Sequence, residues 1–535
     1  MRKSVLILLV LVLTFSIFSV TNASGSELIF GLGEEPENLD PHQATGWQEY
    51  MLLSFIVEPL FTLDQNYEIV PLLARDYQIS DDGLEMDIWL REGITFHTGE
   101  EMTAADVRYS FNRFFEISPQ ADYLPPGRGG VYEIEIVDDY HLIFNFKSPK
   151  PLALYYMSAA HRGIMPEGWL EETPEEDIGI RALVGTGPFM FDRWAAADRI
   201  VLQRFDDYRH GPDFISNTGP ALTETMIFRI IPEDATLTAE IVGGGIDISF
   251  DVPPSVMRAI ARFEDRIRIE TAPSEGVQYL AMNRNREVFE DDEVRQAIAH
   301  GINKEQIAEA AWFGMGEPIS GLITENIIGY YPGVEDVEYK YDPDKARQLL
   351  DQAGWDEIGA DGIRRRDGEK LELELITFSN VDQWRAAGEI VQAQLEELGI
   401  GIKLELAEVG ATYDRSNRDE WDLGIYRNTW WLGQPFLIFL THSDNIPDED
   451  GGTNKAHWGD PELDRNLEIA GESMDEQERI TALNEAQRII VESANWVPLV
   501  SRAQIVATQK DVQGLDELLT HPWWPFLMQA LLLHK

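Results

Sequence analysis

Two short stretches hold the aromatic residues whose chemistry is most useful for binding. One contains Trp47 and Tyr50, and the other reads Tyr426-Arg-Asn-Thr-Trp-Trp431. Pockets for varied organic ligands are lined by aromatic rings and a few fixed polar groups, so both stretches are candidate ligand walls. Residues 421–425 before the second stretch are predicted to be a strand, which places Trp430 and Trp431 in the loop at its end. An ordinary role in the core is the alternative for each ring.

Motifs for catalysis are missing from the sequence. It has no Gly-x-Ser-x-Gly elbow, no His-Glu-x-x-His motif and no cysteine. Without cysteine there is no thiolate nucleophile, no disulfide and no cysteine-ligated metal. The 10 histidines include no HxH or HxxxH pair, so neither a metal site built by the protein alone nor a cofactor is expected. A hydrolase with paired carboxylates stays as an alternative, because 94 acidic residues always provide pairs.

The first residues resemble a targeting segment. Arg2 and Lys3 precede an apolar run from residue 5 to 20, and small residues follow up to Ala23. This pattern predicts a signal peptide over 1–23, and the apolar run is short for a retained membrane anchor, which is the alternative. No cysteine is present to carry a lipid. The expected location is therefore outside the cytoplasm, in a periplasm.

The charge of the chain is strongly acidic. Its formal net charge is −51, from 94 acidic and 43 basic residues. Nucleic acids and anionic lipids are poor partners for such a surface. Because the acidic residues are spread along the whole chain, we interpret them as a solvated surface adapted to salty media. Attraction of cationic ligands is the alternative.

A chain of 535 residues is expected to form two or three domains. Near mid-chain, residues 277–282 predict a buried strand that leads through a polar loop into a helix ending near residue 302. Residues 371–375 alternate as a strand, 384–398 form an amphipathic helix and 400–406 form the next strand. This strand–helix–strand unit predicts an α/β lobe with parallel strands. Thr103 and Asp106 predict the start of an earlier helix.

Ten segments together resemble one family, the extracytoplasmic solute-binding proteins that serve ABC importers for peptides, nickel chelates and some oligosaccharides. The resemblance covers nearly all of the chain after the signal segment. The matching segments, in order, are EPLF (58–61), ITFHTGEEMTAADVRYSFNR (94–113), VGTGPFMFDRW (184–194), RFDDYRHGP (204–212), FRIIPEDAT (228–236), GGGIDI (243–248), YLAMNRN (279–285), DEVRQAIAHGINK (292–304), YDPDKARQLLDQAGW (341–355) and VQAQLEELGIGIKLEL (391–406).

The resemblance implies an α/β, two-lobed, periplasmic-binding-protein-like fold of class II, cluster C, with an enlarged first lobe and a two-segment hinge. Lobe I would comprise residues 24–272 plus 497–535, with a subdomain at about 58–182, and lobe II would comprise 273–496. The chain would cross near 271–276 and 495–498, where Pro273, Gly276 and Pro498 would absorb the hinge rotation. Its expected partners are a small-molecule ligand (peptide, chelate or sugar) and the membrane subunits of an ABC permease. A monomer is expected.

The resemblance also implies individual ligand contacts. Trp430 matches a tryptophan that faces the cleft. Trp431 and Trp47 are further candidate rings from their aromatic chemistry alone. Tyr123 and Tyr413 fall near pocket aromatics of chelate-binding relatives. Arg162 falls near an arginine that pairs with a ligand carboxylate, although a surface role is its alternative.

One feature departs from the family. Peptide-binding relatives usually follow the cleft tryptophan with an aspartate that pairs with the free amine of the peptide. Here Gly433 or Gln434 stands in that place, and Gln434 is expected to contact the ligand instead. A buried ammonium without a partner costs several kcal/mol, so the usual amine clamp is not expected. Sugars, opines and amine-blocked peptides remain open, and a metal chelate would need His442 or His457, the histidines of this region.

Overall fold

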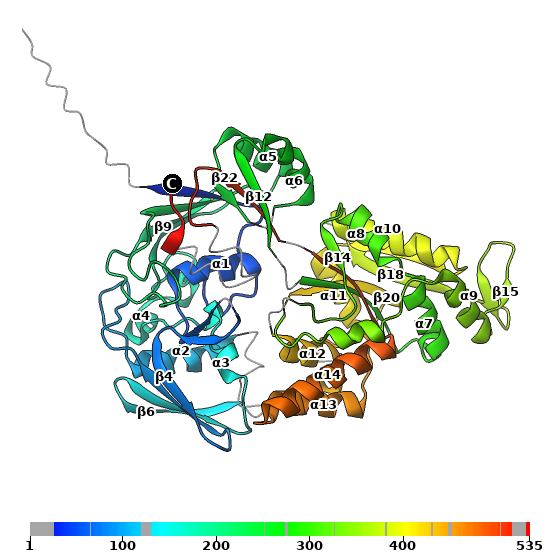
Figure 1. The fold of residues 1–535 in the computed structure, drawn as a ribbon, viewed down its shortest axis with the longest axis horizontal. Coiled ribbons are helices and arrows are strands. Elements are labelled where there is room, and N and C mark those ends of the chain that lie inside the picture. The colour runs from blue at the N-terminus through cyan, green and yellow to red at the C-terminus, as the bar shows by residue number, and fades with distance from the viewer. Residues whose placement is uncertain are drawn as a thin grey trace, which may run out of the picture.

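The computed structural model describes residues 26–64, 66–118, 130–250, 252–272, 276–325, 327–379, 382–429, 432–447, 452–502, 504–515 and 531–535. Two lobes lie side by side (Figure 1). One contains a seven-stranded sheet in the order β12-β22-β11-β1-β10-β9-β8, and the other a six-stranded sheet in the order β14-β21-β13-β20-β18-β19. The two-lobed α/β prediction is thus confirmed. Within the described residues, no helix is long and apolar enough to cross a membrane.

Lobe I is organised around β1, which lies at the centre of its sheet. β1 pairs in parallel with β10 and β11, and aromatic side chains fill the space beneath it: the rings of Phe30 and Phe228 stack with centroids 4.6 Å apart. The elements of this part are β1 (Glu27–Leu32), α1 (Trp47–Ile56), β8 (Phe189–Ala195), β9 (Arg199–Arg204), β10 (Thr225–Ile230), α5 (Asp234–Gly243), β11 (Ile248–Ser249), α6 (Pro254–Ile260), β12 (Ile267–Ala272) and β22 (Gln504–Gln509).

A second sheet enlarges lobe I. Four antiparallel strands in the order β4-β5-β7-β6 enclose their own apolar core. The helix predicted from Thr103 and Asp106 is present, with both halves of its capping box formed. The elements are β2 (Phe61–Leu63), β3 (Ile69–Pro71), β4 (Ala74–Ile79), β5 (Glu85–Leu90), α2 (Ala104–Ile117), β6 (Val131–Asp138), β7 (His141–Phe146), α3 (Ala153–Tyr156) and α4 (Glu167–Glu172).

A buried carboxylate joins three of the signature segments. Glu58 is fully buried and accepts hydrogen bonds from Tyr208 Oη and Thr186 Oγ1, both at 2.7 Å, and its Oε2 lies 2.6 Å from Nε2 of His210. A buried polar side chain is tolerated only when its hydrogen bonds are made, so these partners must stay in place. The signature residues around Glu58 therefore have an architectural role.

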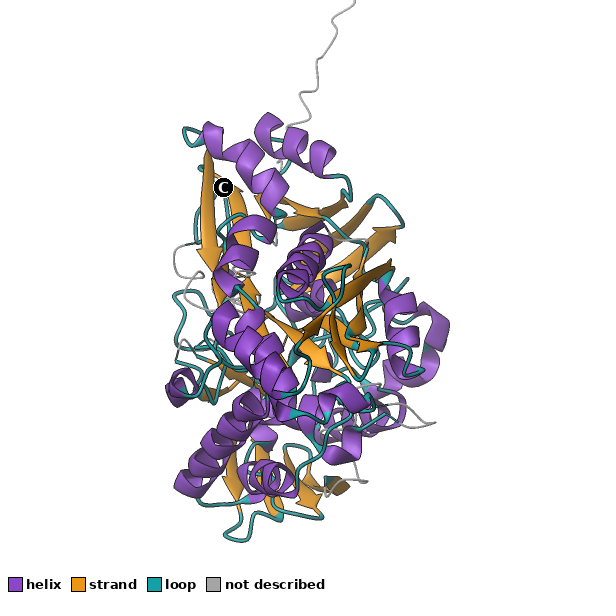
Figure 2. Cartoon of the chain, turned by 90° about the vertical axis from the view of Figure 1, so that its right-hand side faces the viewer, coloured by secondary structure: helices purple, strands orange, loops and turns teal. Residues whose placement is uncertain are grey.

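Lobe II contains the predicted strand–helix–strand unit. β18, α10 and β19 follow one another, and β18 pairs with β19 in parallel, as predicted. Helices flank the strands of this lobe (Figure 2). The elements are β13 (Gly276–Met282), α7 (Asp292–Gly301), α8 (Lys304–Ala311), β14 (Gly316–Pro318), α9 (Pro343–Gln352), β15 (Glu357–Ile358), β16 (Arg364–Arg366), β17 (Glu369–Lys370), β18 (Glu372–Phe378), α10 (Asp382–Glu397), β19 (Gly401–Ala407), α11 (Val409–Asn417), β20 (Leu423–Thr429), α12 (Gly433–Thr441), α13 (Pro461–Glu472), α14 (Glu476–Ser493) and β21 (Trp496–Arg502).

The chain passes between the two large sheets at two places. The first passage joins Ala272, the end of β12, to Gly276, the start of β13, and Pro273 lies between them, outside the described residues. The second passage was expected at 495–498, but it follows Arg502, because the apolar β21 continues the lobe II sheet. Pro498 lies inside β21 opposite Tyr279. Residues 497–502 therefore lie with lobe II rather than lobe I.

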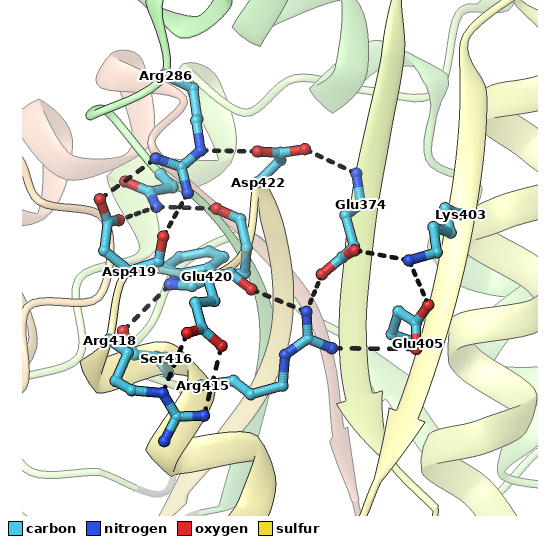
Figure 3. A network of polar contacts seen from close by, with 12 residues as sticks. Arg286, Glu374, Lys403, Glu405, Arg415, Ser416, Arg418, Asp419, Glu420 and Asp422 are labelled. Carbon is cyan, nitrogen blue, oxygen red and sulfur yellow. Dashed lines mark hydrogen bonds and ion pairs between the residues drawn. The ribbon is translucent and has the colours of Figure 1, made fainter.

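A polar network holds together the strand ends of lobe II that lie farthest from these passages (Figure 3). Asp422 accepts from Nε of Arg286 and from the backbone N–H of Glu374, both at 2.8 Å. The Glu374 side chain binds Lys403 at 3.1 Å and also contacts Arg415. The network links β18, β19 and the segments before β20 and after β13, so it fixes the register of the sheet.

Candidate functional site

Strand directions decide which edges of the two sheets face each other. The antiparallel pairing of both β11 and β12 with β22 makes β12 parallel to β1, so both strands end at the edge where the chain leaves lobe I. In lobe II, Gly276 starts β13 at the same passage and pairs with Thr429, the last residue of β20. β18 and β19 run parallel to β20 and end there as well. Ligands of α/β proteins bind beyond the carboxyl ends of strands, which here meet between the lobes.

The lobe I side of this site carries the first predicted aromatic pair. α1 begins at Trp47, directly after the loop that follows β1, and Trp47 packs on the lobe I core while staying partly exposed. The ring of Tyr50 stacks on His161 with centroids 4.8 Å apart. Its hydroxyl donates to the carbonyl of Ala44 at 3.3 Å. The ring is therefore held rigidly, as a stacking surface requires.

Arg162 lies beside these rings and is buried, with 4% of its surface exposed. The surface role considered for it is therefore wrong. Its guanidinium carbon lies 5.0 Å from the ring centroid of Phe114 and 5.8 Å from that of Tyr156, and Nη1 contacts Nε2 of His161. Burial, reinforced by the charge of Arg162, pushes the pKa of His161 well below its ordinary value. His161 is therefore neutral, and the positive charge here belongs to Arg162.

A buried polar triad behind Arg162 was missed by sequence reasoning. Arg113 donates to both carboxylate oxygens of Asp40, at 2.6 and 2.8 Å, and to Nδ1 of His42 at 3.0 Å. Nε2 of His42 donates in turn to the carbonyl of Gly163 at 3.2 Å, next to Arg162. Burial lowers the pKa of His42 to about 4. Although burial alone would raise it, Arg113 holds the pKa of Asp40 below its ordinary value.

The lobe II side carries Tyr413 on α11. Its ring lies 5.6 Å from Phe378 and 6.2 Å from Tyr426, centroid to centroid, and burial raises its pKa. Sequence reasoning overlooked the exposed Arg427, whose guanidinium lies 5.9 Å from a ring centroid of Trp384. The only feature of the sequence that pointed to Arg427 was its position next to the aromatic Tyr426. Tyr123, Trp430 and Trp431 lie outside the described residues.

Neither residue at the position of the usual family amine clamp carries a carboxylate. A Cβ atom on Gly433 would contact Ile323 and would lie 2.9 Å from the carbonyl oxygen of Ile328. Gln434 is buried and donates from Nε2 to the carbonyl of Leu467 at 3.0 Å, in the contact between α12 and α13. Its predicted contact with a ligand stays a prediction.

The two histidines considered for a chelate lie away from the facing edges. His457 contacts Asn285, which follows the far end of β13, at 3.1 Å. His442 follows the carboxyl end of α12, whose first residue adjoins the facing edge. Among the described residues, no group of three histidine, aspartate or glutamate side chains is placed to hold a metal ion.

Comparisons with known proteins agree with this arrangement. Residues 68–447 match the family described as bacterial extracellular solute-binding proteins, family 5 Middle. The chain is 26% identical over 522 residues to the oligopeptide-binding protein AppA of Bacillus subtilis, covering 94% of this chain and 92% of the relative. It is 24% identical over 520 residues to the glutathione-binding protein GsiB of Salmonella typhimurium, covering 94% of each. The crystal structure of NikA from Brucella suis with Fe(III)-EDTA has a TM-score of 0.82 at 23% identity, over 93% of this chain and 99% of that one.

Proposed function

Because the chain belongs to the bacterial extracellular solute-binding proteins of family 5, we propose that it captures a peptide or peptide-like solute between its lobes and delivers it to the membrane subunits of an ABC permease. The observation that carries this proposal is the meeting of both sets of strand ends at the chain passages, with rigid rings and a buried arginine beside them. A solute seated there would contact both lobes. Ligand contacts on both sides favour the closed arrangement over the open one.

We assign different parts of the ligand to different side chains. The Trp47, Tyr50 and Tyr413 rings, with Trp430 and Trp431, supply stacking surfaces that tolerate varied side chains. We assign to Arg162 the fixed positive charge for a carboxylate, because the neighbouring His161 is neutral and carries none. No bond is made or broken in this scheme, so the protein binds and releases its ligand unchanged and needs no cofactor.

The sterically restricted Gly433 and the inward-turned Gln434 support a narrower ligand class. We propose that the natural ligand lacks a free α-ammonium group, as an amine-blocked peptide or an opine does. A free ammonium would lose its hydration without gaining the carboxylate that the clamp normally supplies. A metal chelate or an oligosaccharide is the second candidate class.

We further propose that residues 1–23 direct export and that the protein acts as a monomer in a periplasm. The basic start and apolar run support the first part. Mass spectrometry of the protein purified from its producing cells would show a new N-terminus after Ala23, whereas an intact N-terminus would contradict export by cleavage.

The sharpest test of the ligand class uses two probes that differ only in the amine. Isothermal titration of the purified protein with N-acetyl-trialanine and with trialanine should show at least about tenfold tighter binding of the blocked peptide, since only the free one buries an ammonium. Nanomolar binding of free trialanine would contradict the lost clamp. Nickel bis-histidine and cellotriose, titrated in parallel, test the second class. Both peptides should be recovered intact, because hydrolysis would indicate an enzyme.

The Trp430→Ala variant tests the aromatic wall. It should weaken binding of the best probe by about tenfold or more while the melting temperature stays within about 2 °C, because a cleft ring contributes to the ligand rather than to the core. Unchanged affinity would remove Trp430 from the site. Native mass spectrometry of freshly purified protein gives an independent view of any retained solute.

A further inference from the structure

The lobes contact each other at a place remote from the chain passages. Ser148 and Lys150 follow β7 in lobe I, and Glu472 ends α13 in lobe II. Ser148 Oγ donates to Glu472 Oε1 at 2.9 Å, and Nζ of Lys150 lies 3.5 Å from the same oxygen. Sequence separations above 300 residues show that this is a contact between lobes and not a local one.

An apolar contact adjoins this polar one. Met474 lies just beyond Glu472, in the turn between α13 and α14. A Cβ atom on Gly83, in the turn between β4 and β5, would lie 2.5 Å from Sδ of Met474 and 3.0 Å from Cβ of Pro149. Met474 therefore packs against the β4–β5 turn of lobe I. There the corner between α13 and α14 meets the four-stranded sheet β4-β5-β7-β6 (Figure 1).

A second contact between the lobes lies near the passages instead. The guanidinium of Arg258 on α6 stacks 4.8 Å from the ring centroid of Phe313, just before β14, which pairs with β21. During a hinge rotation, atoms move in proportion to their distance from the axis. The Arg258–Phe313 contact can survive such a rotation, whereas the contact of Glu472 and Met474 must separate.

We propose that Ser148, Lys150, Glu472 and Met474 form an interlobe clasp that stabilises the closed state and so raises ligand affinity without touching the ligand. The four clasp residues act on ligand capture through closure of the lobes and not through contact with the ligand. Their effect on affinity therefore rests on the proposed function. Apparent affinity scales with the fraction of molecules in the binding-competent state, so a weaker clasp lowers affinity through closure. The Lys150 side chain is 15% exposed. Burial lowers its pKa, and Glu472 opposes that shift.

A cross-linking experiment tests whether the clasp forms in solution. The chain has no cysteine, so the double variant Gly83→Cys/Met474→Cys carries the only two thiols. Cγ of Met474 lies 3.2 Å from the Cβ position of residue 83, which places the sulfur of a cysteine at 474 within reach of a disulfide. Mild oxidation of the ligand-free protein should give this intramolecular bond, confirmed by peptide mapping. The control pair Gly83→Cys/Glu389→Cys, with one thiol at the exposed position 389 of α10, should stay reduced. Equal oxidation of the two pairs, or none in either, would overturn the clasp.

Charge reversal tests what the clasp does. Glu472→Lys places two cations together, whereas Lys150→Glu/Glu472→Lys restores an opposite pair in reverse order. For Glu472→Lys we expect a larger radius of gyration in small-angle scattering and about 3- to 10-fold faster dissociation of N-acetyl-trialanine, with association changed less than about twofold. The double variant should recover to within about threefold, and Glu389→Lys should match the wild type.

The two proposals fail differently. If Glu472→Lys and Glu389→Lys give the same radius of gyration and the same dissociation rate, the clasp is overturned while capture stands. If the wild type binds none of the probes but the radius and the cross-link respond as expected, the proposed ligand class is overturned while the clasp stands.

Discussion

At the scale of single residues, Gly433 shows why a family clamp cannot simply be restored in this chain. A Cβ atom there would contact Ile323 and approach the Ile328 carbonyl to 2.9 Å, whereas one on Gly410 would meet nothing within 4 Å. Gly433→Ala should therefore lower the free energy of unfolding by about 1–3 kcal/mol. Gly410→Ala, also near the start of a helix, should leave it unchanged or raise it slightly. Urea denaturation of both variants measures the difference, and equal stability would mean that lobe II relaxes around Gly433.

His42 makes stability depend on pH at the residue scale. Its pKa of about 4 in the folded protein lies below the ordinary value of 6.5, so the unfolded chain takes up the proton first as pH falls. The contribution is complete above pH 6.5 and is lost progressively down to about pH 4, up to about 3 kcal/mol.

Urea denaturation between pH 7 and pH 4 measures this loss. His161 acts in the same direction. Asp40, whose pKa is lowered, matters only at more acidic pH, because a carboxylate contributes until it is protonated. His42→Gln should show a shallower decline than the wild type, and parallel curves would exclude His42 as a source of the pH dependence.

At the scale of elements, the polar network of lobe II adds side-chain hydrogen bonds to the backbone hydrogen bonds of the sheet. Asp422 ties the start of β20 to β18 and to the loop after β13 (Figure 3), and its side chain is 23% exposed. Asp422→Ala leaves Nε of Arg286 and the N–H of Glu374 without this acceptor, so we expect a loss of about 1–3 kcal/mol in unfolding free energy.

A matched exposed acid gives the control for that variant. The Asp344 side chain is 87% exposed and pairs only across one helical turn with Arg347. Asp344→Ala should change stability by no more than about 0.5 kcal/mol. Thermal and urea unfolding of both proteins separate the two cases, and a similar small effect would mean that water replaces Asp422 in the network.

At the scale of the whole molecule, the net charge of −51 sets how the protein responds to salt. Like charges on one surface repel, and the screening length falls from about 10 Å at 0.1 M to about 3 Å at 1 M salt. Stability should therefore rise between 50 mM and 1 M sodium chloride, by on the order of 1 kcal/mol or more, followed as the melting temperature. Sucrose at matched osmolality controls for solvent exclusion. A maximum below 50 mM would contradict salt adaptation and favour attraction of cations.

The fold could be read from the sequence to the extent that patterns are local. The cap at Thr103, the strand–helix–strand unit at 371–406 and the buried β13 all depend on neighbours in the chain, and all are confirmed. The second passage between lobes was placed too early, because an apolar run such as 496–500 fits a strand in either sheet. Only its pairing with β13 decides the choice.

Of the site, the sequence by itself determined the chemical types: aromatic rings on both sides, an arginine, no cysteine and no acid at 433–434. The tertiary structure decided which of these residues meet. Asp40 and His42 are neighbours in one loop, but Arg113 and Arg162 lie more than 70 residues further along the chain, so no local pattern could group the four. They come together because the loop after β1 packs on α2, and the same long-range packing brings Glu472 to Ser148. Contacts of that kind depend on how elements dock, which is fixed by the buried faces of the whole protein and not by any one segment.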